Sequence, residues 1–245
     1  MAGVAKRAKR AMKRVTMAWR HALIDHSPEW ARRWFGAHAS YLDMLLIDHG
    51  IFRLIYLNKH RLSHEAWRCA QPAPHDLRRF KRMGVKTIVN LRGERVCGSF
   101  WHERKECEAL GLNLVNFTIR SRAAPSREDV LKARELFENI EYPMVMHCKS
   151  GADRAGLMSV LYEHVRGKKP IDQALKQLSL RYGHIRQADT GILDAFFERY
   201  LADTKDRPMP FFEWVEKVYD SEDLKASYHA NRWANRLVDR VLQRE

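Results

Sequence analysis

The sequence predicts an α/β fold with a mostly parallel central sheet flanked by helices, and with helical extensions at its N- and C-terminal ends. Short apolar runs alternate along the chain with longer segments whose apolar residues recur at helical spacing. Residues 85–91 form a run rich in β-branched residues, and residues 144–146 form a shorter apolar run. Such runs are typical of strands buried on both faces, and their alternation with helices favours a parallel sheet covered on both sides.

The strands are expected at residues 66–71, 85–91 and 112–119, with a further strand ending in Cys148. Pro72 and Pro74 end the first of them, because proline cannot donate a backbone hydrogen bond. The order of these segments places the Cys148 strand last in sequence among the core strands.

The helices are expected at residues 75–83, 101–110, 127–139, after Arg154, at 171–182, and from about 188–193 to 202. Glycines follow three of these patterns, at Gly84, Gly111 and Gly183, as glycine often does at helix C-termini. Ser126 stands where it can cap the helix at 127–139.

Four regions follow from these patterns. A basic amphipathic segment spans residues 1–33, a helical extension 34–62, the central α/β domain 63–205, and a C-terminal helical extension 206–245. The aromatic residues between 211 and 219 recur on one helix face, and we expect them to cover the core. The apolar residues of 34–62 indicate one or two helices, packed on the domain or lying on a membrane.

Residues 1–33 carry a net charge of +7, half of the +14 of the whole chain. Their apolar residues recur at helical spacing, and a basic amphipathic helix binds anionic membrane surfaces. A solvated tail and an organelle transit peptide are the alternatives. No segment has the composition of a membrane span, so we expect a cytoplasmic protein, peripheral on the inner membrane if residues 1–33 bind lipid.

The overall basic charge favours phosphates and acidic lipids as partners, and we expect no nucleic acid. The four cysteines, Cys69, Cys97, Cys107 and Cys148, show neither paired spacing nor a metal-ligand pattern. We therefore expect no metal, no cofactor and a reducing compartment.

Residues 143–156 organise the rest of the chain. A strand end leads into the loop from His147 to Arg154, and a helix pattern begins directly after it. Backbone N–H groups converge where a loop meets a helix N-terminus, so an anion can bind there. The helix N-terminus and the guanidinium of Arg154 favour the thiolate form of Cys148, which is the nucleophilic form. Five intervening residues can wrap around a phosphoryl group while Arg154 binds two of its oxygens.

The stretch His147-Cys148-Lys149-Ser150-Gly151-Ala152-Asp153-Arg154 resembles the signature loop of the cysteine-dependent protein tyrosine phosphatase superfamily, closest to its dual-specificity and lipid-directed branches. The resemblance covers roughly residues 65–203. It implies a cysteinyl-phosphate intermediate on Cys148 and a phosphate site built from Lys149, Ser150, Gly151, Ala152 and Arg154. Further candidate substrate contacts are Arg92, Arg120, Arg122, His147 and Asp189.

The sequence departs from the family pattern at two places. Ser121 stands where many members have the aspartate that protonates the leaving oxygen. Asp153 is the expected replacement, as in lipid-active members with an aspartate before the loop arginine. Its alternative role is to pair with a neighbouring base or to support the loop backbone. Ala155 replaces the usual hydroxyl residue, so turnover should be slower unless Ser150 substitutes.

Three functions follow. The first is a protein tyrosine or dual-specificity phosphatase. The second is a membrane-surface phosphatase of a phosphorylated lipid or glycolipid, of the inositide or lipid A type, favoured by Lys149, Asp153 and the basic start. The third is a catalytically weak phosphate-binding module, suggested by the missing acid and hydroxyl. The partners are accordingly a phosphorylated protein or lipid and, through residues 1–33, an anionic membrane.

Overall fold

The computed structural model describes residues 56–95 and 97–228. The predicted basic segment 1–33, most of the 34–62 extension and the end of the 206–245 extension lie outside the described residues. In the part that is described, no helix is both long enough and apolar enough to cross a membrane.

Five strands form one sheet in the order β1-β2-β5-β3-β4. Their bounds are β1 His60–Arg61, β2 Ala66–Ala70, β3 Thr87–Asn90, β4 Asn113–Asn116 and β5 Met144–Cys148. β2, β5, β3 and β4 are parallel, and β1 pairs antiparallel with β2 at one edge. The predicted, mostly parallel sheet is thus confirmed. The two-residue strand β1 was not predicted, because so short a segment shows no periodicity.

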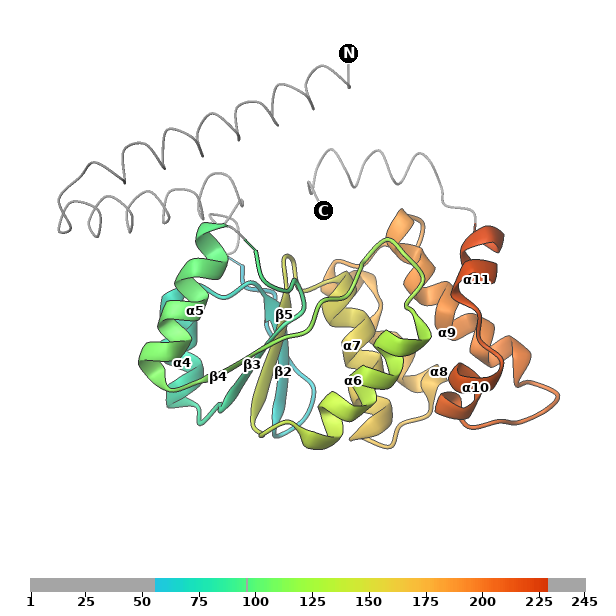
Figure 1. The fold of residues 1–245 in the computed structure, drawn as a ribbon, viewed down its shortest axis with the longest axis horizontal. Coiled ribbons are helices and arrows are strands. Elements are labelled where there is room, and N and C mark those ends of the chain that lie inside the picture. The colour runs from blue at the N-terminus through green and yellow to red at the C-terminus, as the bar shows by residue number, and fades with distance from the viewer. Residues whose placement is uncertain (1–55, 96, 229–245) are drawn as a thin grey trace, which may run out of the picture.

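The helices cover both faces of the sheet (Figure 1). α4 and α5 lie on one face, and α6 to α9 lie on the other, with α10 and α11 further out on that side. Their bounds are α4 Pro74–Arg82, α5 Gly98–Leu110, α6 Arg127–Asn139, α7 Asp153–Val165, α8 Ile171–Ala174, α9 Ile192–Asp203, α10 Phe211–Lys217 and α11 Ser221–Ser227. The predicted cap of α6 is confirmed, since Ser126 accepts a hydrogen bond from the Asp129 backbone N–H (3.0 Å).

The core is divided by the sheet into two clusters, and the period-2 alternation of β5 decides which side chain enters which. Val145 packs into the smaller cluster beneath α4 and α5, while Met144, Met146 and Cys148 pack into the larger one. Phe211, Trp214, Val215, Tyr219 and Leu224 join the larger cluster. The prediction that the aromatic residues after 210 cover the core is therefore confirmed.

The predicted continuous helix at 171–182 is wrong. α8 ends at Ala174 and is followed by two short 3-10 helices, η2 Leu175–Gln177 and η3 Leu180–Tyr182. The carbonyls of Gln177 and Tyr182 accept hydrogen bonds from side chains of distant segments, Arg68 and Asn58. A regular helix would use the Gln177 carbonyl to accept from the Arg181 N–H, but here Arg68 binds it. The bond from Asn58 holds the end of the segment at Tyr182.

Candidate active site

Cys148 lies at the carboxyl end of β5, the middle strand of the sheet. Its neighbour in register is Ala70 at the end of β2. On the other side, the Leu91 backbone N–H donates to the His147 carbonyl (2.9 Å). Both neighbouring strands are therefore paired with β5 up to its end, which fixes the point where the loop begins. Ligands of parallel sheets bind at this edge.

A buried arginine, Arg68 in β2, holds the outer side of the loop. Its Nη2 donates to the carbonyls of Gly151 (2.7 Å) and Ala152 (2.9 Å). Its Nη1 donates to the carbonyl (2.7 Å) and side-chain oxygen (2.9 Å) of Gln177. Burial lowers the pKa of Arg68 to about 10, so it is still a cation at neutral pH. Its charge also interacts electrostatically with Cys148.

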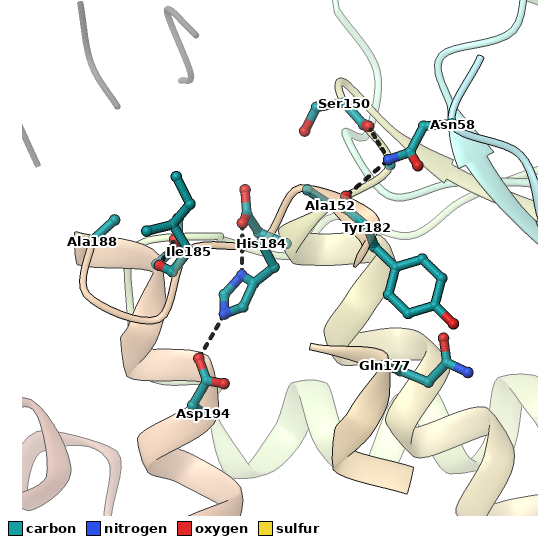
Figure 2. A network of polar contacts seen from close by, with 12 residues as sticks. Asn58, Ser150, Ala152, Gln177, Tyr182, His184, Ile185, Ala188 and Asp194 are labelled. Atoms are coloured by element: carbon teal, nitrogen blue, oxygen red, sulfur yellow. Dashed lines mark hydrogen bonds and ion pairs between the residues drawn. The ribbon is translucent and has the colours of Figure 1, made fainter. Parts of the chain in front are cut away.

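The two preceding carbonyls of the loop are held from the same side. The Asn58 side-chain amide donates to the Ser150 carbonyl (2.9 Å) and also to the Tyr182 carbonyl (2.9 Å), as Figure 2 shows. The Gln71 backbone N–H lies 3.4 Å from the Lys149 carbonyl. Four successive carbonyls, from Lys149 to Ala152, are thus bound from outside the loop.

This outward orientation determines where the loop's amide groups point. In a trans peptide the N–H points opposite to the preceding C=O. The amides of residues 150–153 are therefore directed to the inner side of the loop, next to Cys148. A concave ring of N–H groups at a helix N-terminus is an anion site. The arrangement can bind a phosphoryl group in front of the sulfur.

Gly151 allows the loop to approach β2 closely. Its φ of +74° is in the left-handed region, and a Cβ at this position would lie 2.8 Å from the Ala70 nitrogen and from the Cys69 carbonyl carbon. Any side chain here would separate the loop from the strand that supports it.

Asp153 and Arg154 are the first two residues of α7, and both are buried. The Asp153 Oδ1 lies 2.8 Å from the Nδ1 of His184. The opposite ring nitrogen, Nε2, lies 2.6 Å from the Oδ2 of Asp194 in the first turn of α9. Burial opposes the charge of His184, but hydrogen bonds to Asp153 and Asp194, together with their charges, outweigh it and raise the pKa of His184 to about 9.

A second buried network lies on the other face of the sheet, behind Cys148. The Nε2 of His147 lies 2.6 Å from the Oε1 of Glu103 in α5, although their alignment is not that of a hydrogen bond. Gln71 donates to the other Glu103 oxygen (2.9 Å) and accepts from Arg92 (3.0 Å). Alternation along β5 thus places His147 opposite to Cys148, fully buried, and not in the phosphate cradle.

The remaining predicted substrate contacts lie at different depths. Arg92 is buried and bound to Gln71, whereas Arg120 is exposed and Arg122 is half-buried, on either side of the buried Ser121. Asp189 begins the 3-10 helix η4 Asp189–Gly191. Burial and then the charges of Asp189 and Asp194 raise the pKa of Tyr228 to about 12, so Asp189 lies near that phenol. The substrate roles of these residues stay predictions.

Sequence reasoning missed four residues that build the site. Asn58, Arg68, His184 and Asp194 come from segments far from the loop in sequence. Only Arg68 carried a signal: an arginine inside an apolar strand must find buried acceptors.

Comparison with known proteins agrees with this geometry. A family model described as DSP-PTPase phosphatase fused to NAD+ kinase matches residues 56–191, more than half of the chain. No curated protein matches.

Similar solved structures include TpbA of P. aeruginosa, with 18% identity, a TM-score of 0.48, and coverage of 70% of this chain and 90% of that one. PTPMT1 is 16% identical, with a TM-score of 0.44, over 61% of this chain and 99% of that one. Tk-PTP in its active form is 21% identical, with a TM-score of 0.44, over 59% and 99%. One TpbA structure holds phosphotyrosine and one PTPMT1 structure holds PI(5)P.

Proposed function

Since this chain belongs to the family of DSP-PTPase phosphatases described as fused to NAD+ kinase, we propose that it hydrolyses phosphomonoesters through a cysteinyl-phosphate intermediate, as a phosphatase of the protein tyrosine and dual-specificity type. The observation that carries the proposal is the outward fixation of four successive loop carbonyls by Arg68, Asn58 and Gln71. It supports a rigid cradle for a phosphoryl group directly beside the buried Cys148.

In the first step the Cys148 thiolate attacks phosphorus, an S–P bond forms, and the bond to the leaving oxygen breaks. The inward amides and the planar guanidinium of Arg154 stabilise the equatorial oxygens, where charge develops. Asp153 gives a proton to the leaving oxygen. In the second step water attacks phosphorus and releases a proton to Asp153, the P–S bond breaks, and the thiolate is restored.

The side chain after Arg154 influences only the second step. Ala155 is fully buried and carries no hydroxyl that could assist the departing thiolate. We therefore expect the covalent intermediate to accumulate. Ser150, which is half-buried within the loop, is the residue that we propose as a substitute.

The test is phosphate release from nitrophenyl phosphate by the wild type, Cys148→Ser and the matched control Cys107→Ser. Cys107 is equally buried but lies in α5. We expect loss of turnover only in Cys148→Ser, and an acid-quenched wild-type protein that is heavier by one phosphoryl group. Turnover by Cys148→Ser would refute the mechanism. Protection of Cys148 from alkylation by phosphate, without turnover, would indicate a phosphate-binding module instead.

A second candidate substrate class is a phosphorylated lipid or glycolipid at a membrane surface. It is favoured by the +7 charge of residues 1–33, by Lys149 and Asp153 in the loop, and by the bases Arg120 and Arg122. Deletion of residues 1–33 should then leave nitrophenyl phosphate hydrolysis intact but reduce binding to anionic vesicles, and added salt should have the same effect. A release panel of phosphotyrosine peptides, inositides and phosphorylated glycolipids ranks the substrates. Equal vesicle binding by both proteins would remove the support from residues 1–33.

A further inference from the structure

The Asp153 side chain is one end of a chain of three buried groups, in which His184 links it to Asp194. His184 stands between two carboxylates, 2.8 Å from Asp153 and 2.6 Å from Asp194. Figure 2 shows the contact between His184 and Asp194 as a dashed line. The His184 side chain is 1% exposed and each carboxylate side chain 6%. The three residues come from the start of α7, the loop after η3 and the start of α9.

The two distances limit where protons can be. An imidazole that faces two ionised carboxylates at hydrogen-bond distance must carry a proton on both nitrogens. If the ring is neutral, one nitrogen accepts, and the carboxyl that faces it must carry the proton. In either arrangement the three groups together hold one proton more than a neutral imidazole between two carboxylates.

The neighbouring charges do not provide this proton. Arg154 follows Asp153 on α7, and the Arg68 cation of β2 interacts electrostatically with Asp153. Arg186, in the His184 loop, is paired with Glu198 of α9 (2.8 Å). The Tyr228 phenol interacts with the charge of Asp194 and donates to the Ala188 carbonyl (2.7 Å). Among these groups, the imidazole is the natural proton donor to Asp153 near neutral pH.

We propose that His184, oriented by Asp194, positions Asp153 and supplies through it the proton that the leaving oxygen receives. This inference rests on the proposed function, and it assigns the acid of the reaction to a linked set of three residues.

The proton balance is complete within these groups. The Nδ1 proton of His184 passes to the Asp153 carboxylate, and the Asp153 carboxyl passes a proton to the leaving oxygen as its bond to phosphorus breaks. His184 is then neutral and still donates its Nε2 proton to Asp194. In the second step the attacking water releases a proton to Asp153, which returns it to Nδ1. No other reactant is needed.

The test compares kcat/KM for an alkyl phosphate and nitrophenyl phosphate in Asp153→Asn, His184→Gln and the double variant. An alkyl leaving group, of pKa roughly 15, needs the proton, whereas nitrophenolate, of roughly 7, hardly does. We expect His184→Gln to lose about 100-fold on the alkyl ester and less than about tenfold on the aryl ester. The fall in kcat/KM of His184→Gln at alkaline pH should disappear. The double variant should be no less active than the more impaired of the two single variants.

The control is His64→Gln, whose side chain is 84% exposed and lies outside the site. Asp194→Asn is the milder second variant if His184→Gln folds poorly, and it should show the same dependence on the leaving group. Equal losses on both esters, or additive losses in the double variant, would overturn the proposal while Cys148-dependent turnover persists. Absence of that turnover in the wild type would instead refute the proposed function itself.

Discussion

The carbonyl side of the loop and its Asp153 end are both held by buried cations, yet pH acts on them differently. Arg68 binds peptide carbonyls, which do not titrate, and stays charged at neutral pH although burial lowers its pKa to about 10. His184 binds two carboxylates and has a pKa of about 9. The cradle for the phosphoryl group should therefore keep its shape while the end that carries the proton changes state.

The largest expected effect is a change in stability with pH, caused by His184 at the Asp153 end of the loop. The folded pKa of His184, about 9, is above the unfolded value of 6.5. Its stabilisation is therefore fully present below pH 6.5 and is lost as pH rises through 9. We expect this single group to lower the free energy of unfolding by about 3 kcal/mol across that window. Urea titrations at pH 6.5 and 9.5 measure the loss.

Two variants show whether His184 is the group that causes this pH-dependent loss of stability. His184→Gln should lack this pH-dependent loss, whereas the exposed control His64→Gln should keep it. If His184→Gln loses as much stability between the two pH values as the wild type, then His184 is not the group that titrates, and the contrast between the two ends fails.

The next effect concerns the carbonyl side. Arg68→Met removes the side-chain donor to the Gly151 and Ala152 carbonyls, and the Ala152 carbonyl keeps the bond from the Gly156 backbone N–H. The loop can then rotate its amides away from the phosphoryl group. We expect kcat/KM for nitrophenyl phosphate to fall about 100-fold. The fall should persist at every pH from 6 to 8, because the wild-type Arg68, with a pKa of about 10, stays charged over this whole range. Circular dichroism at each pH confirms that the variant is folded.

The matched control is Arg78→Met, which breaks an exposed ion pair with Glu106 on the α4–α5 side and should leave activity unchanged. A change in the shape of the Arg68→Met pH profile would show that the support of the loop carbonyls by Arg68 and the titration of His184 are coupled. That outcome would contradict the contrast drawn above between the carbonyl side of the loop and its Asp153 end.

The smallest effect separates backbone strain from crowding in the loop. Gly151 and Gly84 both have positive φ, +74° and +82°, but a Cβ at Gly84 has no neighbour within 4 Å. Both alanine variants should lose about 1 kcal/mol of stability from the left-handed backbone. Only Gly151→Ala should also lose activity, roughly tenfold, because its Cβ pushes the loop from β2. Equal activities would mean that this close approach does not matter.

Much of the fold could be predicted because its signals are local. Apolar runs, a capping serine and glycines after helices are each properties of a few neighbouring residues, and so is the loop from His147 to Arg154. Hydrophobic periodicity predicted one helix over 171–182, but the segment is irregular, because Arg68 and Asn58 from distant parts of the chain bind its carbonyls. Tertiary contacts overrode the local preference there.

The supports of the site could not be predicted for the same reason. His184 follows a glycine in a polar stretch, and nothing near it in sequence indicates that it meets Asp153 and Asp194. For His147 the motif indicated proximity to substrate, but strand alternation directs its side chain to the opposite face. The face to which a side chain points, and the partners that it meets, depend on the assembled sheet. A motif alone does not specify them.

The span of the bonds that hold the loop has a consequence for how the chain folds. Arg68 joins partners 83 and 109 residues away, and Asn58 joins Tyr182 across 124 residues. Contacts of such high sequence separation form slowly, since the entropy of closing the intervening chain must first be lost. When α7 has just emerged from the ribosome, the nascent chain thus contains the nucleophile Cys148. It does not yet contain the later residues that complete the support of the loop. During refolding, activity should return after helical circular dichroism, at the rate of the last long-range closure.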